Sequence, residues 1–386
     1  MNHLCKLPYK RVPGAPLTLA ATAAVLLVLA ACTSGTAQTA GVQAISLKAF
    51  PGGGAWALTE HRLLRTNDRG SSWTDVTPPG LQGSPTNAQT APVVFFRDHS
   101  LGWVASFEAS AAALTSVTVF RTSDGGKTWE SSPLLLGVDP GQQFAGTGSL
   151  FFLDGSTGWL MAKLQTSSAG SAGVLYRTND GGNTWTKASI PIGNPVRFNS
   201  PSDGWVAGGP AGGEMYVTHD GGVTWSRQEV PQRSADKPWL TTVGVPRFFD
   251  ASNGVLPVHV RSETVDGSDH YFFVTHDGGT SWASAGPPLE TTRGGTSFAA
   301  SVNASDWFLL ADHLYVTHDA GRNWLTVTTG QNLQDAVSVD FVTTEEGWAN
   351  SEKTTCPGKA NCFVESLLLT TQNGGQTWVS GSIPTQ

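Results

Sequence analysis

The chain repeats one eight-residue pattern seven times, with the consensus Thr-x-Asp-x-Gly-x-(Thr/Ser)-Trp. The copies span residues 66–73, 122–129, 178–185, 218–225, 275–282, 317–324 and 371–378. Self-similarity at a nearly fixed period indicates one supersecondary unit copied along an array, because a single unit cannot bury its apolar face alone. The repeat therefore constrains the fold more strongly than local propensity does. It also gives a structural explanation for many residues that would otherwise suggest chemistry.

A second motif alternates with the first and runs from Phe through a turn to Gly-Trp, as in Phe95 to Trp103 and Phe151 to Trp159. Short β-type runs separated by turn residues predict four antiparallel strands in each unit. Residues 43–386 divide into seven units of roughly 49 residues. Four-stranded blades around an axis leave few exposed sheet edges. The sequence thus predicts an all-β, seven-bladed β-propeller over 43–386.

The residue types of the repeated turn suit structural work. Thr and Asp side chains accept hydrogen bonds from turn N–H groups, and Gly permits positive φ. We expect the third position of each copy to be structural: Asp68, Asp124, Asp180, Asp220, Asp277, Asp319 and Asn373. Of the 14 tryptophans, 13 occupy positions in the two motifs. Burying roughly 200 Å² for each ring favours a core role over a sugar-binding platform.

The N-terminus has the features of a signal peptide over residues 1–31. A basic start precedes an apolar stretch at 17–31, and Leu-Ala-Ala-Cys ends at Cys32. This ending resembles a bacterial lipobox, so we expect Cys32 to be lipidated and 32–42 to be a flexible tether. An ordinary secretory signal cleaved nearby is the alternative. The expected location is the outer face of the bacterial cytoplasmic membrane, reached through the N-terminal lipid only.

Charge and cysteine content narrow the partner classes. Residues 1–31 contain three of the 23 basic residues and none of the 30 acidic ones, so removing them changes the net charge from −7 to −10. An acidic exterior argues against nucleic acid as a partner.

Cys356 and Cys362 flank a turn-rich segment and predict a local disulfide in an exported protein, with free thiols as the alternative. We expect no metal, no cofactor and a monomer.

The repeat resembles the Asp-box, or bacterial neuraminidase repeat, across essentially all of 43–386. Its alternation with the Phe-to-Trp motif most resembles the photosystem II stability/assembly factor-like group. That resemblance implies a seven-bladed propeller that acts as a binding scaffold, with lipoproteins among its relatives. The same repeat also occurs in sialidases, xyloglucanases and sortilin-type receptors, so the resemblance specifies fold more closely than function.

A glycoside hydrolase is the alternative function, either sialidase-like or with two catalytic carboxylates. Resemblance to sialidases would imply a tyrosine nucleophile, an arginine cluster and an Arg-Ile-Pro signature, and this signature is missing. The four tyrosines after the signal peptide fit packing on third strands: Tyr176, Tyr216, Tyr271 and Tyr315. The arginines directly before the repeated Thr fit the blade periphery: Arg65, Arg121 and Arg177. Three aspartates recur at one turn position, which suggests turn capping rather than catalysis: Asp98, Asp154 and Asp250. Three histidines recur at another turn position, which suggests solvated side chains rather than metal ligands: His219, His276 and His318. These observations favour a protein that is not an enzyme.

Loops on the face opposite the repeated turns are the expected binding surface, since loops on a rigid scaffold often carry function. The exit loop of blade four and the long loop at 258–270 of blade five contain Trp and Arg, types enriched in interface hot spots. The candidate partner-binding residues are Arg233, Lys237, Trp239, Arg261, Asp266, His270 and Arg293. Trp239 binds a partner or plugs the central channel. The predicted partner is a protein or a cell-envelope polymer, and a purely structural support role stays open.

Overall fold

The computed structural model describes residues 44–59, 62–81, 92–110, 113–137, 142–166, 170–231, 239–262, 267–292, 298–355 and 363–384. The chain separates into two units, Met1–Thr39 and Ala40–Gln386, and all described residues belong to the second. The predicted signal peptide, Cys32, Cys356 and Cys362 lie outside the described residues. No helix in the described ranges is long and apolar enough to span a bilayer.

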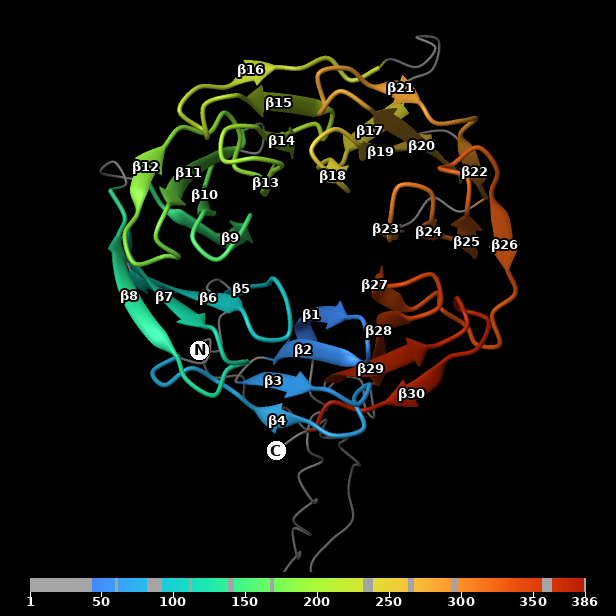
Figure 1. Cartoon of the computed structure of the whole chain (residues 1–386), viewed down its shortest axis with the longest axis horizontal. Helices are drawn as coiled ribbons and strands as arrows, with labels where there is room; N and C mark the ends of the chain where they lie inside the picture. The colour runs from blue at the N-terminus through green and yellow to red at the C-terminus, as the bar shows by residue number, and fades with distance from the viewer. Residues whose placement is uncertain are drawn as a thin grey trace, which may run out of the picture. The chain divides into compact units, whose positions relative to one another are not determined.

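The described residues form seven antiparallel sheets around a central opening, and each sheet comes from one continuous stretch of chain (Figure 1). This confirms the predicted seven-bladed β-propeller. The first strand of each blade is innermost. Blades one to three consist of β1 (Ala44–Phe50), β2 (Gly54–Thr59), β3 (Leu63–Thr66) and β4 (Thr74–Asp75); β5 (Val93–Phe96), β6 (Gly102–Ser110), β7 (Ala113–Thr122) and β8 (Glu130–Leu135); and β9 (Phe144–Phe152), β10 (Gly158–Leu164), β11 (Ala172–Thr178) and β12 (Thr186–Ala188).

Blades four, six and seven also have the predicted four strands. They consist of β13 (Val196–Phe198), β14 (Gly204–Gly208), β15 (Glu214–Thr218) and β16 (Ser226–Arg227); β23 (Phe298–Ser301), β24 (Trp307–Leu310), β25 (Leu314–Thr317) and β26 (Leu325–Val327); and β27 (Ala336–Phe341), β28 (Gly347–Thr355), β29 (Phe363–Thr371) and β30 (Val379–Gly381).

Blade five differs because its sheet has six strands. They are β17 (Trp239–Val243), β18 (Arg247–Phe248), β19 (Gly254–Ser262), β20 (Ser268–Thr275), β21 (Ala283–Ser284) and β22 (Leu289–Thr291). Both β17 and β18 pair with β19, and both β21 and β22 pair with β20. The inner and outer strands are therefore each divided in two. Pro246 and the Pro287-Pro288 pair lie in the two interruptions, where proline has no N–H to continue a ladder.

Each Asp-box turn is held by its own side chains. In the second copy, Thr122 Oγ1 donates to Asp124 Oδ1 at 2.9 Å and accepts the Gly126 N–H at 2.8 Å. Asp124 in turn accepts the N–H and the hydroxyl of Thr128. These hydrogen bonds, with the Thr128 hydroxyl first, lower the pKa of Asp124 to about 2. The aspartates of the other five acidic copies also have pKa values of about 2.

Aromatic stacks join successive blades. From blade one to blade five, the second-strand Trp of one blade packs on the first-strand Phe of the next. The distance between ring centroids is 3.7 Å for Trp103 on Phe152 and 3.6 Å for Trp159 on Phe198. The six second-strand tryptophans are at most 1 % exposed. The Asp-box tryptophans are only partly buried, apart from Trp378 at 4 %. The predicted core role therefore holds fully for the second motif and in part for the first.

The Phe-to-Trp motif predicts a weaker copy from Phe298 to Trp307, and the structure of blade six corrects this assignment. The repeated Thr faces Gly in blades two to five and seven, as in Gly102 opposite Thr122. In blade six Trp307 itself lies opposite Thr317, so its ring points to the other face of the sheet. Phe308 occupies the position that the stacking Trp has in blades one to four, and its ring stacks on Phe341 with 3.6 Å between the ring centroids. The physical reason is that the Trp of blade six lies one residue earlier relative to the repeated Thr, and a shift of one residue along a strand moves its side chain to the other face of the sheet.

The ring closes without exchanging a strand between blades seven and one. Side chains join the two blades instead: Lys48 pairs with Asp340 at 2.9 Å, and Glu346 accepts the Gly52 N–H at 2.8 Å. Near the C-terminus, Arg62 donates to the Pro384 carbonyl at 2.7 Å. Ile383, which is 5 % exposed, packs on Ala57 and Leu64 of blade one.

Candidate functional site

The Asp-box turns and the turns between first and second strands share one end of the ring, which we call the Asp-box face. A backbone hydrogen bond links the two turns within a blade, as from Gly125 to Ser100 and from Gly181 to Ser156. The repeated histidines add a second link: His219 Nδ1 lies 2.8 Å from Asp203 Oδ1, and His318 Nδ1 lies 2.6 Å from Asp306 Oδ1. These histidines therefore hold turns together within separate blades.

The structure brings together part of the predicted partner-binding cluster. The backbone of Trp239 begins β17 and lies opposite Ser262, and exposed Arg261 lies opposite Leu240. Both residues therefore belong to paired strands of blade five, and the prediction that Trp239 lies in a loop is wrong. The other loop candidates are outside the described residues: Arg233, Lys237, Asp266 and Arg293.

The prediction of a long loop at 258–270 is also wrong, because β19 and β20 extend through both of its ends. His270 is 4 % exposed and lies opposite His259, with 4.8 Å between the centroids of their stacked rings. Desolvation, then the charge of His259, lowers the pKa of His270 to about 4. His270 is therefore a buried neutral residue rather than a surface contact. The alternation of Val258, His259 and Val260 was the sequence signal for a strand.

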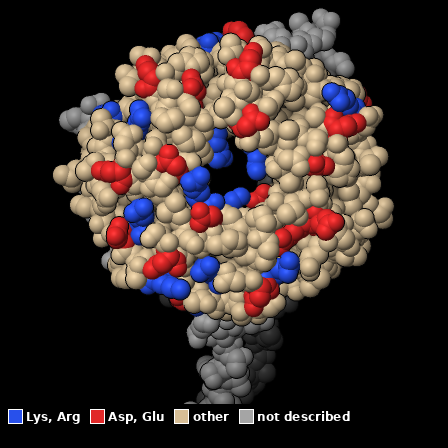
Figure 2. Space-filling view, viewed as in Figure 1, with Lys and Arg blue, Asp and Glu red and all other residues tan. Residues whose placement is uncertain are grey.

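The central opening carries basic residues that the sequence analysis did not single out. Figure 2 shows Lys and Arg side chains around the wall of this opening. The position before the first-strand Phe is Phe in blades two and three, but it is Arg197 in blade four and Arg247 in blade five. Both arginines are exposed on innermost strands. The change from Phe to Arg at one repeat position was the available signal.

Arg197 and Arg247 lie on the innermost strands β13 and β18 of neighbouring blades. The Arg197 guanidinium carbon lies 4.9 Å from the Phe151 ring centroid, a cation–π distance. The Arg197 side chain is exposed, but the surrounding protein still removes part of its hydration; this desolvation and, second, the charge of Arg247 lower its pKa, and it remains protonated. Neither arginine forms an ion pair or hydrogen bond with the described residues. Two like charges held close in a channel favour an anionic partner.

The described residues offer little support for catalytic chemistry. Asp98 and Asp154 each accept two backbone N–H groups of their own turn, and Asp250 does the same. The four tyrosines of the described residues lie on third strands: Tyr176, Tyr216, Tyr271 and Tyr315. Within the described ranges, no group of three His, Cys, Asp or Glu residues could hold a metal ion.

The arginines before the repeated Thr do not converge on a common point. Arg65 lies over Trp56 of its own blade at 5.6 Å, and Arg177 lies over Trp159 at 5.8 Å. Arg65 also donates to the Gly125 carbonyl of the next blade at 3.4 Å. Each guanidinium thus packs within or between particular blades.

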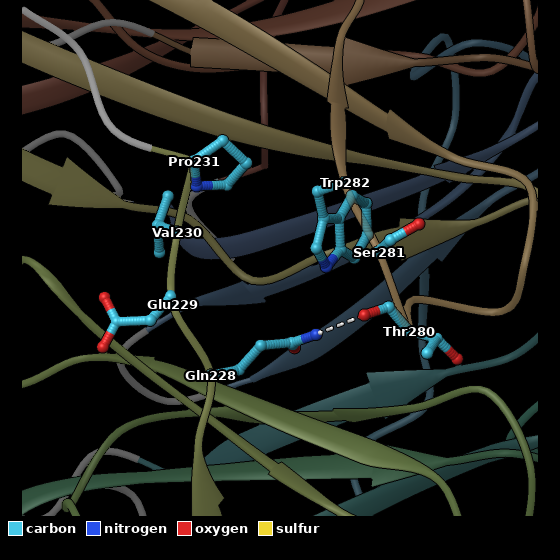
Figure 3. A pocket seen from close by; sticks show the side chains of 7 residues that line it. All are labelled: Gln228, Glu229, Val230, Pro231, Thr280, Ser281 and Trp282. Carbon is cyan, nitrogen blue, oxygen red and sulfur yellow. Dashed lines mark hydrogen bonds between the residues drawn. The ribbon is translucent and has the colours of Figure 1, made fainter.

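Pockets lined by described residues lie between blades four and five and between blades five and six. Between blades four and five, a pocket of about 510 Å³ is lined by residues of 228–231 and 280–282, with the Trp282 ring on one side and Val230 and Pro231 on the other (Figure 3). Gln228 bridges the base of this interface, accepting from Trp205 Nε1 at 3.0 Å and donating to the Gly279 carbonyl at 2.7 Å. A second pocket of about 220 Å³ lies between blades five and six.

Comparisons with known proteins agree with this architecture. A family model described as BNR/Asp-box repeat matches residues 216–227. No curated protein matches the sequence significantly.

Solved structures resemble the chain at low sequence identity, so they bear on fold alone. The GH74 xyloglucanase from Xanthomonas campestris is 15% identical, with a TM-score of 0.51 over 90% of this chain and 68% of that one. A PL25 ulvan lyase bound to a GlcA–Rha3S ligand is 10% identical, with a TM-score of 0.52 over 89% and 97%. YCF48 bound to a D1 peptide is 15% identical, with a TM-score of 0.48 over 90% and 92%.

Proposed function

We propose that this Asp-box β-propeller is a non-enzymatic binding scaffold that engages an acidic segment of a protein partner at its central channel. The observation that carries the proposal is the pair Arg197 and Arg247, which lies in the channel wall without a carboxylate from the described residues. Arg supplies five donors in a planar fork that matches a carboxylate, and Phe151 restricts the movement of one guanidinium. The overall acidity of the chain makes this local concentration of positive charge more selective.

The channel suits a binding role for a second reason. Its wall consists of innermost strands whose opposite sides are packed into the blade core, as the buried residues Val196 and Phe198 on either side of Arg197 indicate. The arginines are therefore presented by a rigid frame. Presentation on a rigid frame reduces the ordering entropy that binding costs. The alternation along β13 thus supports a preformed site rather than one that is ordered by its partner.

The first prediction concerns partner capture. Replacing both channel arginines (Arg197→Ala and Arg247→Ala) should reduce recovery of a crosslinked partner at least tenfold, because both charges that face the acidic segment are lost. The measurement is crosslinking in native membranes followed by quantitative mass spectrometry. Arg227→Ala is the matched control, since Arg227 is exposed on outermost β16. Recovery should also fall as ionic strength rises.

Equal partner recovery with the double variant would refute the channel as the binding site. Co-purification of a polysaccharide that depends on the same arginines would replace the protein partner with an envelope polymer. Release of reducing sugar from envelope glycans by the purified protein would favour the glycoside hydrolase alternative.

We further propose that the protein is exported and anchored at the outer face of the cytoplasmic membrane by a lipid on Cys32. A polar tether over 32–42 then holds the propeller away from the bilayer. A disulfide between Cys356 and Cys362 fits the same compartment. The last described residues before and after the two cysteines, Thr355 and Phe363, lie opposite each other in paired strands.

The second prediction concerns these three cysteines. Cys32→Ser should move the protein from the membrane fraction to the soluble fraction, because the lipid is the proposed membrane contact. In the wild-type protein, Cys356 and Cys362 should resist alkylation until a reductant is added. Peptide mass spectrometry of membrane-purified protein measures both properties. Membrane retention of Cys32→Ser would disprove the anchor, and immediate alkylation would disprove the disulfide.

A further inference from the structure

The interface between blades five and six departs from the repeat. At the other interfaces within blades one to five, a second-strand Trp stacks on a Phe of the next blade. Blade five has Val255 at the Trp position, and blade six has Ser301 opposite Trp307, at the Phe position. The Trp307 ring faces blade five, and its centroid lies 5.5 Å from the centroid of the Phe272 ring. This interface is therefore packed by different residues from the interfaces within blades one to five.

The 220 Å³ pocket opens between these two blades on the Asp-box face. Its apolar lining comes from Phe249 and Val274 together with three small side chains, Ala285, Ala304 and Ala320. Pockets for drug-sized ligands span about 300–1,000 Å³. The pocket between blades five and six therefore suits a smaller molecule with a compact apolar body.

The polar lining of the same pocket contains no carboxylate. His276 Nδ1 lies 2.7 Å from Asn253 Oδ1, whereas the corresponding histidines of blades four and six face Asp203 and Asp306. The Asn253 amide nitrogen donates to both oxygens of Asp250, which fixes its orientation and leaves Oδ1 to accept from His276. His276 Nδ1 therefore carries the proton, and Nε2 can only accept a hydrogen bond.

Arg322 supplies the positive charge of the pocket. It lies on the exposed part of the sixth Asp-box turn and forms no ion pair or hydrogen bond within the described ranges. Its charge contributes to the low pKa of nearby Asp319, whose carboxylate is held by Asn323. The pocket thus combines one guanidinium, one imidazole and an apolar floor, in a chain with a net negative charge.

We propose that this pocket binds a small organic carboxylate, separately from the channel. The apolar body of the ligand packs against Phe249, Ala285 and Ala320. The carboxylate faces the Arg322 guanidinium, which binds it with charge-assisted hydrogen bonds. Substitution of Asn for Asp beside His276 removes the negative charge that would repel such a ligand at the turns of blades four and six.

The test is isothermal titration calorimetry of the full propeller with benzoate as the probe, because benzoate joins a compact apolar ring to a carboxylate. Benzyl alcohol provides the ring without the charge, and inorganic phosphate provides charge without the ring. We expect saturable binding of benzoate and at least tenfold weaker binding of the other two. Arg322→Ala should weaken benzoate binding at least tenfold, and Arg227→Ala should leave it unchanged.

A second variant tests the position of the ligand independently of charge. Ala304 is exposed in the turn between β23 and β24, so Ala304→Phe should fill the pocket without disturbing the core. It should abolish benzoate binding while the thermal unfolding midpoint stays at the wild-type value. No saturable benzoate binding by the wild type, or equal binding by Ala304→Phe, overturns the proposal. Loss of partner capture in Arg197→Ala with intact benzoate binding separates this site from the channel.

Discussion

Trp159→Ala is expected to lower the free energy of unfolding by about 3–5 kcal/mol, the usual cost of removing a fully buried large aromatic side chain. Trp159 is 0 % exposed, and its ring lies 3.6 Å from Phe198 with an interplanar angle of 5°. Its Nε1 donates to the Gly221 carbonyl at 3.1 Å. The substitution therefore removes a stack, a hydrogen bond and packed volume from one interface. Urea unfolding monitored by circular dichroism measures the change.

Trp225→Ala is the matched control because Trp225 belongs to the neighbouring Asp-box and is only partly buried. It also makes one backbone hydrogen bond, to the Ser189 carbonyl at 2.8 Å. We expect it to lose less than half as much stability as Trp159→Ala. Equal losses for the two variants would show that the second-strand stacks are not what holds successive blades together.

The second large effect is a loss of stability in mild acid that depends on His270. Burial lowers the pKa of this imidazole from its ordinary 6.5 to about 4, so between these values the unfolded chain binds more protons than the folded one. Stability is then fully present above pH 6.5 and falls as the pH drops toward 4. A pKa change of this size corresponds to a contribution on the order of 3 kcal/mol to the free energy of unfolding.

Desolvation sets the direction of this effect, and nearby charges modify it. Desolvation and then Arg261 lower the pKa of His259, and Asp312 opposes the lowering at His270. The Asp-box aspartates act in a lower range, because their pKa values of about 2 stabilise the fold above pH 4 and lose this contribution between pH 4 and 2. The two pH ranges can therefore be separated by experiment.

His270→Gln should remove at least half of the pH dependence of stability between pH 6.5 and 4. It should leave the steeper loss below pH 4 unchanged. Chemical unfolding at half-unit pH intervals measures both ranges. Arg227→Gln, at an exposed position on outermost β16, is the control and should follow the wild-type curve. A wild-type stability that is flat from pH 6.5 to 4 would contradict the assignment of a neutral buried pair.

The repeat made the architecture predictable because each copy specifies the same hydrogen-bonded turn and the same strand register. The prediction was wrong where a copy is degenerate. Trp307 follows Asp306 rather than Gly, and only the pairing with Thr317 reveals that its ring faces the other side of the sheet. Likewise, the insertion in blade five contains polar residues that suggested a loop. Pairing between β19 and β20 gives His270 a buried strand position.

The candidate site was harder to predict than the fold. Sequence reasoning favoured loop insertions, but Arg197 and Arg247 lie at a strand position that is Phe in neighbouring blades. Whether such a position contacts a neighbouring sheet or the central opening depends on the radius at which the innermost strand lies. That radius follows from the number and tilt of the blades, so the pattern of a single repeat does not specify it. Similarly, Asn253 has an amide where Asp203 and Asp306 have a carboxylate. The effect of this change on charge becomes evident only from the contact of Asn253 with His276.

Closure of the ring by side chains has a consequence for how such a chain can change in length. Every sheet is one continuous stretch, and the contacts of Lys48 with Asp340 and of Arg62 with Pro384 belong to the terminal blades alone. Duplication or deletion of one repeat unit in the gene would therefore add or remove one whole blade without leaving a strand unpaired. The terminal blades would carry their mutual contacts into the new ring, and only its circumference would have to adjust.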